Sequence, residues 1–311
     1  MTVHPSSLKA RRALSLYGLL SAPTVFLAIF FLGPLSIMMV YTFLTPGLYG
    51  GVEWVFSHLN YGRILGWADT RYDQFDPVYI SIFFRSVWLA GTTVLTCLVI
   101  CYPFAFWVAR QPERWKNFFI FLITLPFFIS LIVRLFAWVL ILRPTGFLNQ
   151  ALLGTGLVDQ PLDIIFTDMA VVIGMTYVFI PFMFLPLYSS IEKLDGNLVE
   201  ASQDLGANAL QTFLRVVLPM TLPGIIGGSI IVFIPSLGNF IVPSLLGGAR
   251  VVMIGNLIEQ QFLSARNWPF GAALGMMVMA AVLVLLMIYV RILSREDSQA
   301  EIKQPNEEEV R

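Results

Sequence analysis

The stretch EASQDLGANALQTFLRVVLP, residues 200–219, is polar and charged, yet it lies between two long apolar runs. Gly206 can adopt a positive φ, so it can join one short helix to the next. Glu200 falls near the expected start of the first helix, where its charge suits the positive end of the helix dipole. Pro219 is expected to end the second helix. Four apolar residues have the i, i+3, i+4, i+7 spacing of one helix stripe: Leu210, Phe213, Leu214 and Val217.

The composition around this stretch is that of a membrane protein. Of 311 residues, 57% are hydrophobic and 12% are charged, whereas soluble domains are about one quarter charged. Apolar runs long enough to cross a hydrocarbon core of about 30 Å recur along the chain. We therefore predict an all-α polytopic fold, because a β-barrel would show alternating segments of about ten residues. Six spans are expected at about 14–41, 81–109, 117–142, 169–191, 221–246 and 269–293.

The distribution of Lys and Arg predicts the orientation, because cytoplasmic segments carry an excess of both. With the N-terminus inside, the inner segments hold Lys9, Arg11, Arg12, Arg110, Arg114, Lys116, Lys193, Arg215, Arg291, Arg295, Lys303 and Arg311. The outer loops hold Arg63, Arg71, Arg143, Arg250 and Arg266. Both termini and residues 200–219 are therefore expected in the cytoplasm. The expected segments are a cytoplasmic 1–13, a transmembrane domain 14–293 with an outer loop 42–80 and an inner loop 192–220, and an acidic, disordered cytoplasmic tail 294–311.

Several function classes are disfavoured by the sequence. The net charge is zero, so nothing suggests nucleic acid, and His4 and His58 are isolated, so a metal site has no support. Cys97 and Cys101 lie one helical turn apart in an expected span, which favours apolar packing over redox chemistry. No stretch fits G-x-x-x-x-G-K-[ST], the loop that holds ATP phosphates. We expect no catalytic residue and no cofactor on this chain.

The inner loop is better suited to a protein partner than to a lipid surface. A helix that lies on lipid favours many Lys and Arg on its polar face. Here Arg215 is the one basic residue of the segment. Its polar residues are Glu200, Gln203, Asp204, Asn208, Gln211 and Thr212.

The segment resembles the EAA loop of importer permeases of the ATP-binding-cassette superfamily. That pattern is E-A-A, three residues, Gly, nine residues, Ile, one residue, Leu-Pro. Five residues match in register: Glu200, Ala201, Gly206, Leu218 and Pro219. Ser202 replaces the second Ala and Val216 replaces Ile. The resemblance implies a coupling helix that docks on an ATP-hydrolysing subunit, with Glu200 and Gly206 critical and with Asp204 and Phe213 also in the coupling set.

A wider resemblance covers residues 80–293 and points to the polyamine (spermidine/putrescine) branch of these permeases. It is carried by FISLIVRLFAW (128–138), PFMFLPLYSSIEKLDGNLVEASQDLGA (181–207) and LLGGARVVMIGNLIEQQFLSARNWPFGAA (245–273). It implies a bacterial inner-membrane importer subunit that works by alternating access. The implied partners are a dimer of ATP-binding subunits that holds ATP and Mg, a second related permease in a heterodimer, and an extracytoplasmic binding protein.

The expected translocation pathway contains no Asp or Glu in mid-membrane. A polyamine would then meet aromatic rings through cation–π contacts and carbonyl or amide oxygens. Five residues are candidates, with ordinary packing as the other interpretation: Trp138, Tyr177, Phe179, Asn239 and Phe240. Some polyamine permeases of this type carry an acid near the position of Asn239. Selection here would therefore fall to the binding protein or to the partner permease.

Arg134 and Arg85 fall within or near the expected spans. A mid-span Arg costs about 2.5–3.5 kcal/mol on insertion scales. For Arg134, snorkelling and pairing with an acid of a partner subunit both remain open. Arg85 is at the outer end of its span and is expected to snorkel.

Two alternative functions remain. One is an importer permease for another small organic solute, such as an opine or an amino-acid derivative. The other is a secondary transporter driven by an ion gradient, which usually needs acidic residues inside the membrane for coupling.

Overall fold

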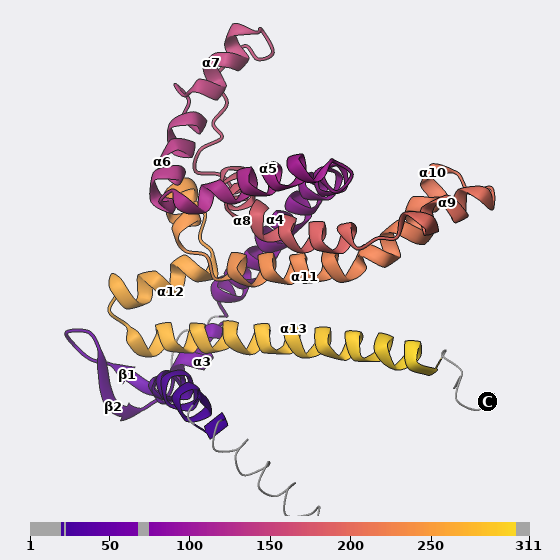
Figure 1. Cartoon of the computed structure of the whole chain (residues 1–311). Helices are drawn as coiled ribbons and strands as arrows, with labels where there is room; N and C mark the ends of the chain where they lie inside the picture. Colours follow the sequence, from indigo (N-terminus) through magenta and orange to yellow (C-terminus); the bar gives the residue numbers. More distant parts are fainter. Residues whose placement is uncertain (1–19, 22, 68–74, 303–311) are drawn as a thin grey trace, which may run out of the picture. The chain divides into compact units, whose positions relative to one another are not determined.

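The computed structural model describes residues 20–21, 23–67 and 75–302, with side chains described as far as Arg291 (Figure 1). The chain divides into two compact units. One comprises the described residues up to Asp76 together with those from Gln260 onwards, and the other runs from Pro77 to Glu259. Each unit is described by itself.

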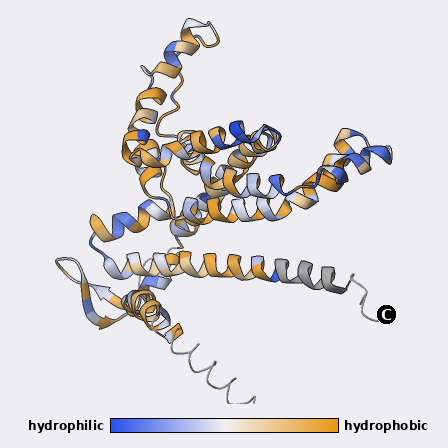
Figure 2. Ribbon diagram, viewed as in Figure 1, coloured by the Kyte–Doolittle hydropathy of each residue, from blue (hydrophilic) through white to orange (hydrophobic). Residues whose placement is uncertain are grey.

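Among the described residues, the predicted number of six membrane spans is confirmed, although two of the spans have other bounds than predicted. Helices that are long and apolar enough to cross a bilayer, by length and composition, cover Pro23–Tyr41, Val78–Ala109, Leu131–Gly154, Asp168–Glu192, Ala209–Leu237 and Trp268–Arg291. Figure 2 shows that apolar residues dominate these helices. Residues 14–19 of the expected first span lie outside the described residues.

The core of the 77–259 unit is built on α8 (Asp168–Glu192), which packs against both α4 (Val78–Ala109) and α11 (Leu218–Leu237). Just over half of the residues of α8, 13 of 25, are buried. Two glycines of α11 allow the close approach to α8. A Cβ at Gly228 would lie 2.9 Å from the sulfur of Met183, and a Cβ at Gly224 would overlap Ser190. Small residues serve this purpose in membrane helix packing because they let two backbones approach closely.

The two cysteines are part of the same core. Cys97 and Cys101 of α4 are fully buried against α8. Their sulfurs lie 3.7 Å from the carbonyl oxygen of Thr176 and 3.6 Å from that of Ile180. Both are free thiols within a packed interface, as the packing interpretation predicts.

The prediction of one continuous span over 117–142 is wrong. The chain forms α5 (Glu113–Thr124), a 3₁₀ turn η2 (Leu125–Phe128), α6 (Leu131–Leu142) and α7 (Phe147–Gly154). Pro126 is the second residue of the 3₁₀ turn, and Ile129 is extended, with φ −104° and ψ 135°. A proline cannot donate to the helical ladder, which accounts for the break near this position. Figure 1 shows α6 leaving the end of α5 in a clearly different direction.

The predicted span 221–246 is also interrupted. Helix α11 ends at Leu237 with Gly238 as its C-cap, and a π-helical turn η4 (Pro243–Gly247) follows. The start of α12 (Ile254–Leu263) lies directly on this break, because a Cβ at Gly255 would overlap the carbonyl groups of Gly238 and Asn239.

The other unit holds α2 (Gly33–Tyr41), preceded by a π-helical turn η1 (Ala28–Leu32), and α13 (Trp268–Ile302). Within the predicted loop 42–80, β1 (Leu44–Pro46) pairs antiparallel with β2 (Val52–Phe56), and α3 (Leu59–Ile64) follows. Helix α13 packs on α2, α3 and β1.

Two buried contacts hold this hairpin in place. The Asn60 amide donates to the carbonyl oxygens of Thr42 and Leu44, at 2.9 and 3.0 Å.

The C-terminal tail differs from the expectation. The disorder predicted after Leu293 is wrong as far as Ile302, because α13 continues to that residue. The remaining predicted tail residues, 303–311, and the predicted N-terminal segment 1–13 lie outside the described residues.

Candidate functional site

The polar segment between the fourth and fifth spans begins with α9 (Gly196–Asp204). The side chain of Asp195 caps this helix by accepting from the backbone amide of Asn197 at 3.0 Å. Glu200 is therefore in the middle of α9, and the prediction that it lies near the helix start is wrong. An Asp is among the strongest N-capping residues, which explains why the helix begins there.

The predicted turn at Gly206 is present. Gly206 has φ +84°, its amide donates to the carbonyl of Gln203 at 2.9 Å, and the amide of Ala207 donates to that of Ser202 at 3.1 Å. This is a left-handed helix C-cap, for which glycine is preferred. A Cβ at Gly206 would meet nothing within 4 Å, so glycine is required by the backbone angle and not by crowding.

Helix α10 (Ala209–Thr212) follows at once and begins with a capping box. Asn208 accepts from the backbone of Gln211 at 2.9 Å, and the Gln211 side chain accepts from the backbone of Asn208 at 3.0 Å. The hydroxyl oxygens of Ser202 and Thr212 are 2.7 Å apart, so α9 and α10 are hydrogen bonded across the Gly206 turn. We call residues 195–212, the central part of the expected inner loop 192–220, the coupling loop, after the role that the resemblance implies for it.

The prediction that Pro219 ends a helix is wrong. Helix α10 continues through a π-helical turn η3 (Phe213–Val217) into α11, and Pro219 is in the first turn of α11. Proline has no backbone N–H to donate. The π turn just before Pro219 changes the helical hydrogen-bond pattern at this point, so the helix continues through the proline. The coupling loop is therefore joined to a membrane span without a break.

Two residues of the predicted apolar stripe are packed against the rest of the protein and two are exposed. Phe213 contacts the ring of Tyr102, with centroids 5.7 Å apart, and Val217 is buried. The Tyr102 hydroxyl also lies 2.9 Å from that of Thr221. Leu210 and Leu214 are exposed. Phe213 therefore packs against α4, Val217 is buried, and the other two members of the stripe lie at the surface.

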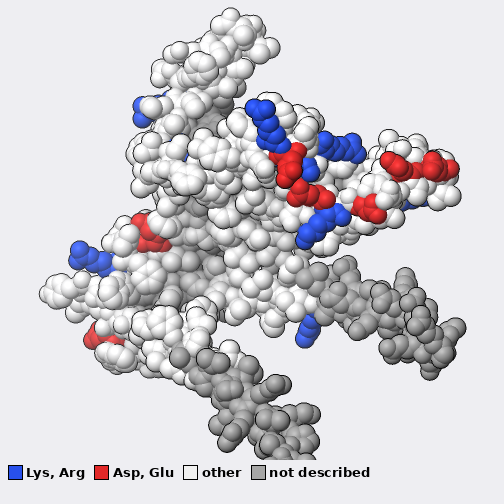
Figure 3. Space-filling model, in the orientation of Figure 1, with Lys and Arg blue, Asp and Glu red and all other residues white. Residues whose placement is uncertain are grey.

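The exposed face of the coupling loop carries the predicted acidic residues. Glu200, Ala201, Asp204 and Gly206 are exposed, whereas Leu218 is half-buried. Figure 3 shows acidic side chains gathered over α9 and α10. Leu205, which the sequence analysis missed, is 89% exposed beside Gly206. The sequence feature that could have identified Leu205 is an apolar residue directly before a glycine that ends a helix. A leucine side chain that protrudes among carboxylates favours contact with a protein partner over exposure to water.

The predicted pathway residues are only partly brought together. Trp138 of α6 and Tyr177 of α8 meet edge to face at 5.6 Å, and the Arg134 guanidinium lies 5.9 Å from the Tyr177 ring. Phe179 is 5% exposed and packs in the core, with its ring 6.0 Å from that of Phe182.

The other two predicted pathway residues lie at the break after α11. Asn239 uses its side-chain oxygen to accept from the amide of Val242 at 3.0 Å, and Phe240 is exposed. The Asn239 side chain therefore has a structural role at the break.

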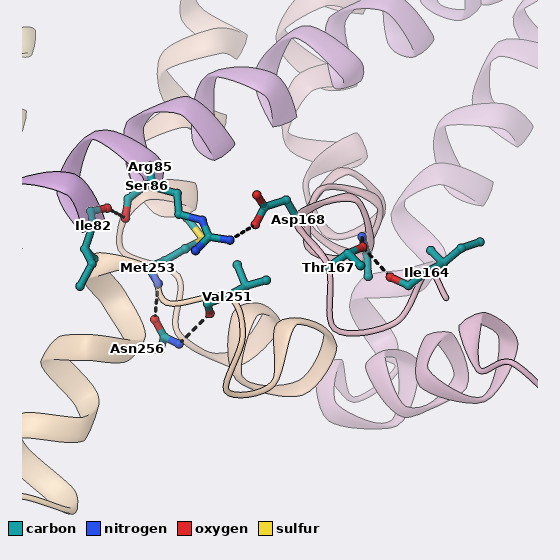
Figure 4. Close-up of polar contacts among 10 residues, drawn as sticks. Ile82, Arg85, Ser86, Ile164, Thr167, Asp168, Val251, Met253 and Asn256 are labelled. Carbon is teal, nitrogen blue, oxygen red and sulfur yellow. Dashed lines mark hydrogen bonds and ion pairs between the residues drawn. The ribbon is translucent and has the colours of Figure 1, made fainter. Parts of the chain in front are cut away.

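Arg85 does not simply snorkel, which corrects the expectation. Its guanidinium lies 2.5 Å from the carboxylate of Asp168 in the first turn of α8 (Figure 4). Next to it, the Ser86 hydroxyl accepts from the buried amide of Ile254 at 2.8 Å and thereby joins α4 to the start of α12. At the other end of α8, Glu192 pairs with Lys116 at 3.2 Å and accepts from the Tyr188 hydroxyl at 2.5 Å.

Among the described residues there is no group of three or more His, Cys, Asp or Glu that could hold a metal ion. The two ion pairs at the ends of α8 are structural contacts between helices.

Residues 101–296 match the family model described as binding-protein-dependent transport system inner membrane component. The match covers α8, the coupling loop, α11 and most of α13. The chain belongs to this family.

Curated relatives agree with the family. The chain is 42% identical over 257 residues to the spermidine/putrescine transport system permease protein PotB of Escherichia coli K12, covering 82% of this chain and 90% of the relative. PotB of Haemophilus influenzae is 42% identical over 70% of this chain and 76% of its own length. The inner membrane ABC transporter permease protein YdcU of E. coli K12 is 36% identical over 64% of this chain and 67% of its own length.

Solved structures support the fold. A bacterial ABC transporter involved in import of the acidic polysaccharide alginate matches with a TM-score of 0.69 and 18% identity, over 94% of this chain and 99% of that chain. A second alginate transporter structure, in complex with a pentasaccharide-bound periplasmic protein, matches with a TM-score of 0.66. The chain is thus a multi-pass inner-membrane permease component of an importer that works with a substrate-binding protein. The predicted polytopic helical fold is confirmed, with the short β1–β2 hairpin as its departure from an all-α structure.

Proposed function

We propose that this chain is the polyamine-translocating permease subunit of an ATP-driven importer. The observation that carries the proposal is 42% identity over 82% of the chain to a spermidine/putrescine permease. That similarity spans α8, the coupling loop and α11, the elements that would form and move the pathway.

The energy comes from a separate dimer of ATP-binding subunits, which holds ATP and Mg. The exposed face of the coupling loop is the docking surface on this chain, facing the cytoplasm together with both termini. Glu200 and Asp204 supply charge, Leu205 supplies an apolar contact, and the unbroken helix from α10 into α11 carries motion into the membrane. A second, related permease completes the pathway as a heterodimer.

The distribution of acids favours this mechanism over ion coupling. In the described spans, the acidic residues are Asp168 and Glu192, at the two ends of α8. Ion-coupled transporters usually place carboxylates near the bilayer midplane. A polyamine would instead meet the paired rings of Trp138 and Tyr177, whose faces attract cations. The carboxylates that recognise the amine would come from the binding protein or the second permease.

Transport by the tagged importer, purified with its subunits and reconstituted in proteoliposomes, tests the proposal. We expect uptake of radiolabelled spermidine or putrescine that requires the binding protein and ATP and is insensitive to a protonophore. An excess of unlabelled polyamine should compete, whereas an opine or an amino-acid derivative should not. Competition by a carboxylated solute alone would support the other importer assignment, and inhibition by the protonophore would support a secondary transporter.

A further inference from the structure

Arg134 of α6 has a polar group that its own chain does not satisfy. Its Nε atom is buried and has no hydrogen-bond partner. The ion pairs among the described residues are Arg85–Asp168 and Lys116–Glu192, and neither involves Arg134. A guanidinium is always charged and has five N–H donors in a planar fork that fits a carboxylate. An unpaired guanidinium inside a membrane span therefore requires an acceptor.

The surroundings of Arg134 orient the charge without neutralising it. Its guanidinium lies 5.9 Å from the ring of Tyr177, and the Trp138 ring meets that ring edge to face at 5.6 Å. Aromatic faces attract a cation but accept no charge-assisted hydrogen bond of the kind a carboxylate provides.

The Arg134 guanidinium lies beside the middle of α8, although Arg134 itself is only the fourth residue of α6. Tyr177 is nine residues from the first residue of α8 and fifteen from the last, which places it about 13 Å and about 22 Å from the two helix ends. Lipid headgroups are therefore distant from the Arg134 guanidinium, so the missing acceptor has to lie within the membrane.

We propose that Arg134, with Tyr177 and Trp138, forms a carboxylate-binding site that an Asp or Glu of the second permease subunit occupies in the assembled importer. This inference rests on the proposed function, because a cationic polyamine would be repelled by Arg134 and cannot supply the carboxylate. The site then has two effects. It holds the two permeases in register at mid-membrane, and it neutralises a positive charge beside the pathway through which the amine passes.

The Arg134→Leu variant tests this proposal. The substitution is expected to maintain or raise the stability of the isolated chain but to weaken the binding of the second permease. In the isolated full-length chain, Leu removes an unpaired charge from an apolar span, so the thermal midpoint in detergent should stay the same or rise. In the importer purified through a tag on this chain, the partner carboxylate loses its counter-charge, so the second permease should bind about 100-fold more weakly. Arg134→Lys keeps the charge without the fork and should retain part of the second permease.

Arg143→Gln is the matched control, because Arg143 follows the end of the same helix and is exposed. This control should change neither measurement.

Four results would overturn the proposal. Equal destabilisation of the isolated chain would place the acceptor within this chain. Intact assembly with weaker binding of a carboxylated solute would place it on the substrate. Loss of assembly by the delipidated wild-type importer that anionic lipid restores, with no such dependence in Arg134→Leu, would assign the site to a lipid phosphate. No change in any measurement would show that Arg134 needs no acceptor. In each case, persistent ATP-dependent polyamine uptake by the wild-type importer would leave the proposed function standing.

Discussion

The hydroxyl of Ser202 lies 2.7 Å from the hydroxyl of Thr212, which hydrogen bonds α9 to α10 across the turn at Gly206. Since α10 continues without a break into α11, this contact joins the exposed helix of the coupling loop to a membrane span. Under the proposed function, the loop would transmit a displacement as one rigid piece.

Thr212→Val should loosen this piece without changing side-chain size. Thr212 is buried, and its loss leaves the Ser202 hydroxyl without its partner, at a cost of about 1 kcal/mol in local stability. Limited proteolysis should cleave the coupling loop faster, and binding-protein-stimulated ATP hydrolysis should fall. In the control Thr155→Val, an exposed hydroxyl bonded to its own helix is removed, so both readouts should stay normal. Unchanged cleavage of Thr212→Val would argue against a rigid loop.

Gly206→Ala should strain the turn. A residue with a Cβ pays about 1–2 kcal/mol in the left-handed region, and Gly206 has φ +84° with open space around it. Gly206→Asn should be milder, because Asn tolerates this conformation.

Gly196→Ala is the control, because Gly196 also has open space around it but a negative φ. Coupled ATP hydrolysis should fall in the order Gly196→Ala, Gly206→Asn, Gly206→Ala, and equal activity of all three would contradict the account of the turn.

Glu200→Lys should separate membrane insertion from coupling. Glu200 is exposed in the middle of α9, so its substitution should leave the folded subunit and its thermal midpoint unchanged. A charge reversal on the docking surface should abolish co-purification of the ATP-binding subunit or the stimulation of its activity. Full binding with normal stimulation would remove Glu200 from the coupling set.

The α8–α11 contact should be sensitive to added volume at two glycines. Gly224→Ala and Gly228→Ala place a Cβ against Ser190 and Met183, respectively, and each should destabilise the protein by about 1–3 kcal/mol. Gly227→Ala meets nothing within 4 Å and should be tolerated. Thermal unfolding in detergent measures all three variants, and a midpoint for Gly227→Ala as low as for the other two would indicate a helix effect and not packing.

The Arg85–Asp168 pair should contribute little. Its side chains are 37% and 49% exposed, and exposed pairs are worth about 0–1 kcal/mol and are screened by salt. Asp168→Asn should therefore lower the thermal midpoint slightly at low ionic strength and not at high ionic strength. A large loss that salt does not change would show that the pair is desolvated.

The sequence was informative where one residue type decides a conformation. Gly206 predicted a left-handed turn because few other residues adopt that backbone angle cheaply, and long apolar runs predicted six spans. Proline was a weaker guide. Pro126 interrupts the expected third span, whereas Pro219 sits at the start of a continuous helix. Whether a proline interrupts a helix depends on the turn beside it. Where an irregular turn already lacks the backbone hydrogen bond that the proline cannot donate, the helix continues. Packing decides whether such a turn forms.

Contacts between distant segments could not be predicted from the sequence. The meeting of Trp138 with Tyr177 and the pairing of Arg85 with Asp168 depend on how α4, α6 and α8 pack. Asn239 is a further example. Its position in the sequence suggested a substrate ligand, but its side chain accepts a hydrogen bond within the turn after α11.

The central claim is that this chain forms a gated pathway whose energy comes from a separate ATPase acting on the coupling loop. The most direct measurement is uphill uptake of labelled spermidine into proteoliposomes that contain this permease with its second permease, with or without the ATP-binding subunits. The account predicts accumulation above the external concentration only when the ATP-binding subunits, ATP and the binding protein are present. Accumulation against a gradient by the permeases alone would contradict it.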